Sequence, residues 1–132
     1  MLLVDTNVLV DVLQDDPQWA DWSIGQLRAQ SQIHALVINP VIYAEISLSF
    51  STMEALDKVI ETLALQVREI PRPALFLAGK AFAQYRRRGG ARQQVLPDFF
   101  IGAHAAVEGW PLLTRDTSRL RKYFHSLDVV AP

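Results

Sequence analysis

Short apolar runs alternate with segments of helical character along this chain, and this alternation constrains the fold more than any other feature. Strand-like runs lie at 2–4, 33–38, 67–70, 112–114 and 129–130. Helices are predicted between them, at 8–13, 18–31, 41–50, 53–65, 74–88, 97–108 and 118–124. Parallel strands need a crossover connection, which a helix usually supplies. We therefore predict an α/β fold with a mainly parallel central sheet.

Composition indicates one globular domain spanning residues 1–132, because half of the 132 residues are hydrophobic and a fifth are charged. The chain has no cysteine, which excludes disulfides, thiolate zinc sites and a cysteine nucleophile. Asp5 interrupts the first apolar run, and Asn39 and Pro40 break the longest one, so we expect neither a signal peptide nor a membrane span. A cytoplasmic location is the expectation.

The small net charge of −1 conceals an uneven distribution. Residues 1–79 carry four basic and ten acidic side chains, whereas residues 80–122 carry nine basic and three acidic ones. Clustered cations can bind a polyanion such as nucleic acid, although a short basic run is more often a solvated helix end. The candidates for contacts with RNA are Arg86, Arg87, Arg88, Arg92 and Arg115.

Four carboxylates stand at positions where a carboxylate is costly to bury. Asp5 ends the first strand, Glu45 shares a helical stripe with apolar residues, Asp98 lies in the first turn of an apolar helix, and Asp116 follows a late strand. Buried carboxylates need a cation, and the hard ions Mg²⁺ and Mn²⁺ prefer oxygen ligands. Ligands of parallel sheets bind beyond the carboxyl ends of the strands. We therefore predict an acidic metal pocket.

Each acid also has a purely structural interpretation. Asp5 can cap the following helix, Asp98 can favour the positive end of a helix dipole, and Asp116 can form a cap or an Asx-turn. Glu45 can reach water at a helix edge. Only the combination of the four in one small α/β domain favours a functional site.

The combination also carries a family resemblance. Asp5-Thr6-Asn7 after the first strand, Glu45 in a helix, Asp98 at a helix start and Thr114-Arg115-Asp116 near the end resemble the PIN-domain ribonucleases, and among them the VapC toxins of type II toxin–antitoxin pairs. The resemblance covers essentially the whole chain. It implies a three-layer α/β/α sandwich, cleavage of RNA (tRNA or ribosomal RNA in many relatives) with Mg²⁺ or Mn²⁺, a homodimer, and inhibition by a cognate antitoxin.

The resemblance also implies roles for individual side chains. Asp5 and Asp98 would be the principal metal ligands, and Asp116 would bind or orient a second ion. Glu45 would bind metal or position the attacking water, and Asn7 and Thr114 would support the acids.

Three other functions remain as alternatives. A haloacid-dehalogenase-like phosphatase also has an aspartate after its first strand, but its usual second aspartate would fall where this chain has Asn7. A DNA nuclease of the flap-endonuclease type is normally much longer. A non-catalytic module that binds RNA or protein would use the acids only as caps. No histidine is predicted to be catalytic, since His104 should face away from Asp98 on their shared helix.

Overall fold

The computed structural model describes residues 1–92 and 95–132. Five parallel strands form its central sheet, in the order β3-β2-β1-β4-β5. Their bounds are β1 Leu2–Val4, β2 Leu36–Ile38, β3 Gln66–Val67, β4 Leu112–Leu113 and β5 Val129–Val130. The three middle strands consist of buried Leu, Val and Ile, as expected of parallel strands that are covered on both faces. The prediction of a mainly parallel α/β sheet is confirmed.

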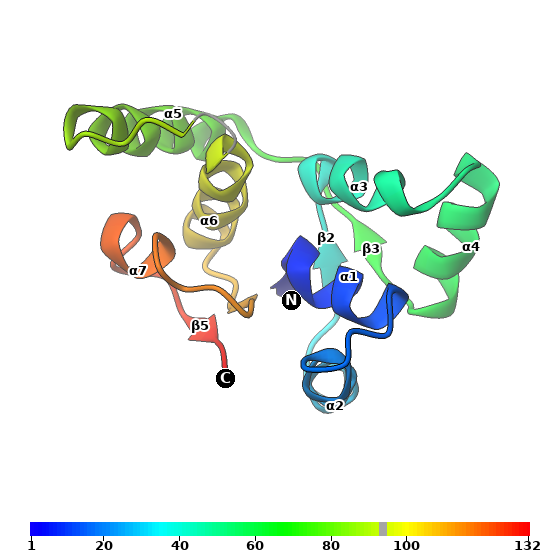
Figure 1. Cartoon of the computed structure of the whole chain (residues 1–132). Coiled ribbons are helices and arrows are strands. Elements are labelled where there is room, and N and C mark those ends of the chain that lie inside the picture. Colours follow the sequence, from blue (N-terminus) through cyan, green and yellow to red (C-terminus); the bar gives the residue numbers. More distant parts are fainter. Residues whose placement is uncertain (93–94) are drawn as a thin grey trace.

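Helices cover both faces of this sheet (Figure 1). One side carries the helices of the first half, α1 Thr6–Leu13, α2 Ala20–Ser31, α3 Pro40–Ile46 and α4 Met53–Thr62. The opposite side carries α5 Arg72–Arg87, α6 Leu96–Glu108 and α7 Leu120–Tyr123. Right-handed crossovers require this division, because the chain moves one way from β1 to β3 and the other way from β3 to β5. The predicted three-layer sandwich is confirmed.

Several predicted elements are shorter in the structure. The helix expected at 41–50 ends at Ile46 and continues as a 3₁₀ turn at Ser47–Ser49, which leaves Leu48 89% exposed. Leu48 therefore does not belong to a buried stripe with Glu45. The strand expected at 67–70 is only Gln66–Val67, and the one at 33–38 begins at Leu36. Apolar runs locate strands well, but they do not fix their ends.

Helix α6 is the most deeply packed helix, as its sequence predicts, with six buried residues. Gly102 lets it approach α7 closely, because a Cβ at this position would lie 2.6 Å from the ring of Phe124 and 2.8 Å from Leu120. The close packing fixes where α7 and the residue before it, Arg119, lie. In the described part of the chain, no helix is long and apolar enough to cross a membrane.

Candidate acidic site

The candidate site lies where the connections of the sheet reverse direction. From β1 the chain passes to β2 on one side, whereas β4 pairs with β1 on the other side. This is the switch point of an open parallel sheet, where ligands of α/β proteins commonly bind. Asp5 follows β1 and Thr114 follows β4, so the topology alone brings the two residues together. The hydroxyl of Thr114 donates a 2.7 Å hydrogen bond to Oδ2 of Asp5.

Asp5 is buried, with only 8% of its surface exposed. Its Oδ1 accepts a 2.7 Å hydrogen bond from the backbone N–H of Thr6, which makes it the N-cap of α1. Burial raises the pKa of the Asp5 carboxyl to about 7 from 3.8; the carboxylates of Asp98 and Glu45 add to this, and the hydrogen bonds from Thr114 and Thr6 oppose it. Asp5 is thus both a cap and a carboxylate whose charge is poorly compensated.

Glu45 joins the site through Thr6. The Thr6 hydroxyl donates a 2.6 Å hydrogen bond to Oε1 of Glu45, which links α3 to the start of α1. Glu45 is half-buried, and burial together with the charge of Asp98 raises its pKa against the opposing hydrogen bond. It does not line the small pocket described below, but it interacts electrostatically with two acids that do.

Asp98 has a cationic partner that the sequence did not reveal. The Arg119 guanidinium donates a 3.2 Å hydrogen bond to Oδ2 of Asp98 in a partly exposed ion pair. Burial still raises the pKa of Asp98 although Arg119 opposes the shift. The Nε of Arg119 is buried, and the described residues offer it no hydrogen-bond partner. The Nε–H donor of Arg119 therefore lies next to the acids without a hydrogen-bond partner among the described residues.

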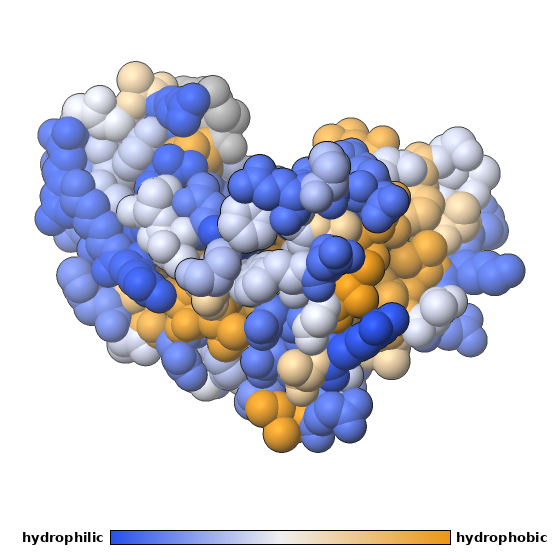
Figure 2. Space-filling view, turned by 60° about the horizontal axis from the view of Figure 1, so that its bottom comes forward, coloured by the Kyte–Doolittle hydropathy of each residue, from blue (hydrophilic) through white to orange (hydrophobic). Residues whose placement is uncertain are grey.

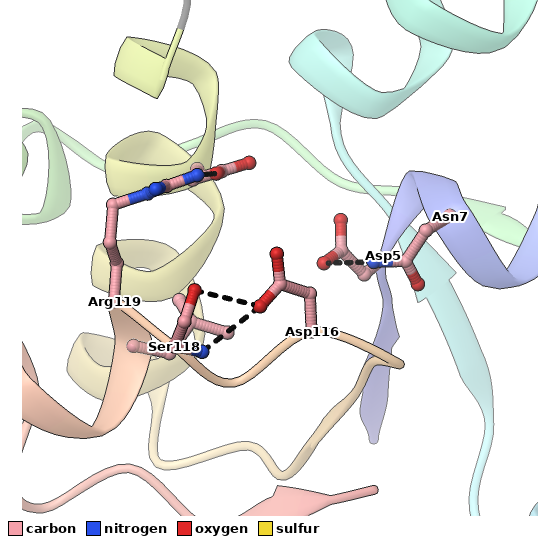
Figure 3. A pocket seen from close by; sticks show the side chains of 7 residues that line it. Asp5, Asn7, Asp116, Ser118 and Arg119 are labelled. Atoms are coloured by element: carbon pink, nitrogen blue, oxygen red, sulfur yellow. Dashed lines mark hydrogen bonds and ion pairs between the residues drawn. The ribbon is translucent and has the colours of Figure 1, made fainter. Parts of the chain in front are cut away.

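Asp116 forms an Asx-turn, which is its purely structural interpretation. Its Oδ1 accepts hydrogen bonds from the backbone N–H and the hydroxyl of Ser118, at 3.0 Å and 2.8 Å. These two bonds lower the pKa of Asp116, so this carboxyl is the one most firmly ionised. In the close view of the site, Asp116 lies between Ser118 and Asp5 (Figure 3).

Asn7 connects the ends of the two strands. Its amide Nδ2 donates to Oγ1 of Thr114 at 3.3 Å and lies 3.4 Å from Oδ2 of Asp5, and its Oδ1 accepts the backbone N–H of Arg115 at 3.1 Å. Because both the NH₂ group and the carbonyl oxygen of its amide form hydrogen bonds, Asn7 holds the loop after β4 against the start of α1. Asn7 and Thr114 thus act on the position of Asp5.

Three of the four predicted acids line one cavity of about 30 Å³. Its polar lining consists of Asp5, Asn7, Asp98, Asp116, Ser118 and Arg119, five of which are labelled in Figure 3. We call it the acidic pocket. A volume of this size holds one or two water-sized species, which is the scale of a single ion.

The donor set of the acidic pocket suits a hard divalent cation. Carboxylate, amide and hydroxyl oxygens are the ligands that Mg²⁺ and Mn²⁺ prefer, and an added positive charge would relieve the raised pKa of Asp5. Within residues 1–92 and 95–132, no three acids or histidines lie close enough to enclose an ion by themselves. Mg²⁺ commonly uses only one or two carboxylates and keeps several waters, so the set fits an ion of this kind.

The predicted RNA-contacting arginines fall into two groups. Arg86, Arg87, Arg88 and Arg92 are exposed at and after the end of α5. Arg115 instead binds Asp11, through Nε at 2.8 Å and a terminal nitrogen at 2.9 Å, and stacks over the ring of Trp19. Asp11 is almost fully buried and also accepts the hydroxyl of Ser23. The RNA contact of Arg115 stays a prediction, and the ion pair gives this arginine a structural role of its own.

Sequence reasoning missed Arg119, Ser118 and Thr6 as parts of the site. Ser118 had a signal, because an Asp followed two residues later by Ser is typical of an Asx-turn. Arg119 had none, since its partner Asp98 is 21 residues away on another helix. His104 lies in the core beside Asn39 and does not line the pocket.

Comparisons with known proteins agree with this fold. The sequence model of the PIN domain matches residues 2–124. No curated protein sequence matches the chain.

Solved structures of toxin–antitoxin proteins share the fold at low sequence identity. VapBC2 from Rickettsia felis, bound to a DNA fragment from its promoter, superposes with a TM-score of 0.75 at 16% identity, covering 99% of this chain and 98% of that one. VapBC-1 from nontypeable Haemophilus influenzae gives 0.73 at 17%, with 98% and 96% covered. DNA-bound VapBC from Salmonella typhimurium gives 0.71 at 17%, also with 98% and 96% covered.

Proposed function

This chain belongs to the PIN domain family, and from that premise we propose that it is a metal-dependent endoribonuclease that acts as the toxin of a toxin–antitoxin pair. The observation that carries the proposal is the acidic pocket, in which Asp5, Asp98 and Asp116 converge from three separate segments at the switch point of the sheet. The structures of VapBC proteins with the same fold support the toxin assignment.

Asp5 and Asp98 would be the principal ligands of the ion, directly or through water, and Asp116 would bind or orient a second ion; the ion is Mg²⁺ or Mn²⁺ in this proposal. A divalent ion here supplies Lewis acidity, which neutralises phosphate oxygens and activates water. Glu45, held by the Thr6 hydroxyl, would accept a hydrogen bond from the attacking water and orient it. Asn7 and Thr114 keep the carboxylate of Asp5 in place through their contacts with it.

Arg119 would have two roles. Without an ion it provides the positive charge that pairs with Asp98, and with an ion present its guanidinium becomes available to a phosphate oxygen of the RNA. The exposed residues Arg86, Arg87, Arg88 and Arg92 would add contacts along the RNA backbone.

The proposal includes two protein partners. We propose a cognate antitoxin, by analogy with the VapBC structures. We also propose a homodimer. A cavity of about 290 Å³ is lined in part by Tyr43, Phe50 and the exposed Met53. Leu48, also exposed, follows the lining residue Ser47 in the chain, and this surface would pair with a second copy. Light scattering of the wild type and of Leu48→Asp tests this surface. A dimeric wild type and a monomeric variant support it, whereas a variant that is still a dimer means that the dimer interface lies elsewhere.

Cleavage of a total cellular RNA pool tests the activity. Purified protein, free of antitoxin, is incubated with Mg²⁺, with Mn²⁺ or with EDTA, beside Asp5→Asn and Asp98→Asn. Discrete products that need metal and both aspartates support the proposal, and mapping of their ends identifies the RNA. Folded wild-type protein that cleaves nothing with either metal would contradict it.

One observation favours a second candidate, a non-catalytic binding module of the same fold. The Arg119–Asp98 ion pair already neutralises part of the pocket without any metal. Mn²⁺ binding measured by calorimetry separates the two candidates, because a module that uses its acids only as caps has no reason to bind the ion. Binding that depends on Asp5 and Asp98 favours the nuclease.

A further inference from the structure

A second cavity, distinct from the acidic pocket, lies between α5 and α7. It has a volume of about 330 Å³, at the lower end of the range of about 300–1,000 Å³ for sites of small ligands. Its polar lining is Lys80 and Gln84 from α5, Arg88 directly after α5, and Lys122, Tyr123 and His125 from α7 and the residues after it. We call it the basic cavity. No carboxylate is among the described residues that line it.

The cations of the basic cavity lack an acidic partner within the described part of the chain. Lys80, Arg88 and Lys122 are exposed, and none of them forms a salt bridge with a described residue. Two of them instead lie beside the ring of Tyr123, Arg88 at 5.4 Å and Lys122 at 5.8 Å from the ring centroid. Unpaired cations that face one cavity repel one another, so the arrangement favours an anion between them. Figure 2 shows hydrophilic residues gathered over the side of the molecule that carries α5 and α7.

Helix α7 connects the basic cavity with the acidic pocket. Arg119, directly before α7, lines the acidic pocket, whereas Lys122 and Tyr123 line the basic cavity. Three to four helical residues cover about 5–6 Å along the axis. The ring of Tyr123 packs against Phe99, the neighbour of Asp98, with centroids 5.4 Å apart. A strand with one phosphate at the mouth of the acidic pocket can therefore place a nearby phosphate in the basic cavity.

We propose that the basic cavity binds the RNA backbone close to the scissile phosphate, with one phosphate between Arg88 and Lys122 and a base against Tyr123. This inference rests on the proposed function, because the substrate in both cavities is the same RNA strand. A tyrosine ring in a basic groove is the usual arrangement for single-stranded nucleic acid. An acidic protein segment would need only the charges and would gain little from the ring.

A charge-matched pair of variants tests the proposal. Arg88→Gln/Lys122→Gln removes one Arg and one Lys from the basic cavity, and Arg28→Gln/Lys58→Gln removes the same charges from α2 and α4. Binding of a labelled single-stranded RNA is measured by fluorescence anisotropy in EDTA over a series of salt concentrations. We expect the first variant to bind about tenfold more weakly at low salt, with a salt slope smaller by about 1.4, which is about 0.7 for each lost phosphate contact. The control should behave like the wild type.

Each outcome decides a separate point. Equal affinity and equal salt slope in both variants would overturn the proposal. If the protein cleaves no RNA but the cavity variant loses RNA binding, the assignment of the basic cavity to RNA stands and the proposed nuclease activity is refuted. Loss of antitoxin binding with RNA binding intact would assign the cavity to a protein and overturn the RNA assignment. Thermal melting monitors folding, and Lys80→Gln on the exposed face of α5 gives a milder second variant with the same expected direction.

Discussion

Thr114 donates its hydroxyl to Oδ2 of Asp5 at 2.7 Å, so the ends of the two adjacent strands β4 and β1 meet through one buried hydrogen bond. This bond only partly compensates the burial of Asp5, whose pKa is raised to about 7. The carboxyl therefore takes up a proton on folding at any pH between about 4 and 7. Its contribution to stability is present at low pH and is lost as the pH rises through about 7.

The pH dependence of stability in the metal-free protein should reveal this carboxyl. A shift from 3.8 to about 7 corresponds to about 4 kcal/mol of unfolding free energy lost between pH 4 and pH 7. Other groups titrate in the same range, so the measurement is the difference between the wild type and Asp5→Asn in urea unfolding at several pH values. The wild type should lose stability relative to Asp5→Asn as the pH rises, and the difference in unfolding free energy should level off above about pH 7. A difference that is constant with pH would show that Asp5 is not strained by its charge.

Arg119 and a metal ion should compete for Asp98, because both are cations at the same carboxylate. Replacing Arg119 by Gln removes the competing charge and keeps a polar side chain. We expect Mn²⁺ to bind about tenfold more tightly, which is about 1.4 kcal/mol, and cleavage at saturating metal to be slower because a phosphate contact is lost. Calorimetry with Mn²⁺ and single-turnover cleavage measure the two effects.

Arg121→Gln is the matched control, since Arg121 is exposed on α7 and lines neither cavity. Its metal affinity should equal that of the wild type. Weaker Mn²⁺ binding in Arg119→Gln would mean that this arginine organises the carboxylates instead of competing with the ion.

Sequence alone predicted a mainly parallel α/β sheet and an acidic pocket beyond its strand ends, because strands that alternate with helices run parallel and end at the same edge. The order of the strands came from the structure. Asp5 and Asp116 follow neighbouring parallel strands, so their meeting requires only the strand order. The sequence could not show the contacts between side chains of different helices, which exist only once those helices pack together in the fold. The Arg119–Asp98 pair depends on how closely α7 approaches α6, which in turn depends on the missing side chain of Gly102.

The structural and functional interpretations of the acids also proved compatible. Asp5 caps α1 and Asp116 forms an Asx-turn, yet both line the acidic pocket. A cap fixes the direction of a carboxylate, and a site needs fixed directions. The sequence treats these as alternatives because it contains no information about what lies opposite the cap.

Gly102→Ala tests the close contact between α6 and α7. The added methyl group would lie 2.6 Å from the ring of Phe124, which is itself packed in the core. We expect a loss of about 1–3 kcal/mol in unfolding free energy, typical of overpacking, as measured by urea denaturation. Gly79→Ala is the control, because a Cβ there meets nothing within 4 Å and α5 should gain about 0.5–1 kcal/mol. Gly102→Ala would also be expected to displace Arg119; stability equal to that of the wild type would rule out the tight contact.

Arg115→Lys separates the structural role of this residue from its predicted contact with RNA. Lysine keeps the positive charge but cannot form the two parallel hydrogen bonds that Arg115 makes with buried Asp11. If the role is structural, unfolding free energy should fall by about 1.5–3 kcal/mol, the scale of a hydrogen bond to a charged group, while RNA affinity stays the same. Arg92→Lys, an exposed arginine with no salt bridge to a described residue, is the matched control and should leave stability unchanged. Weaker RNA binding in Arg115→Lys with wild-type stability would instead assign Arg115 to the RNA.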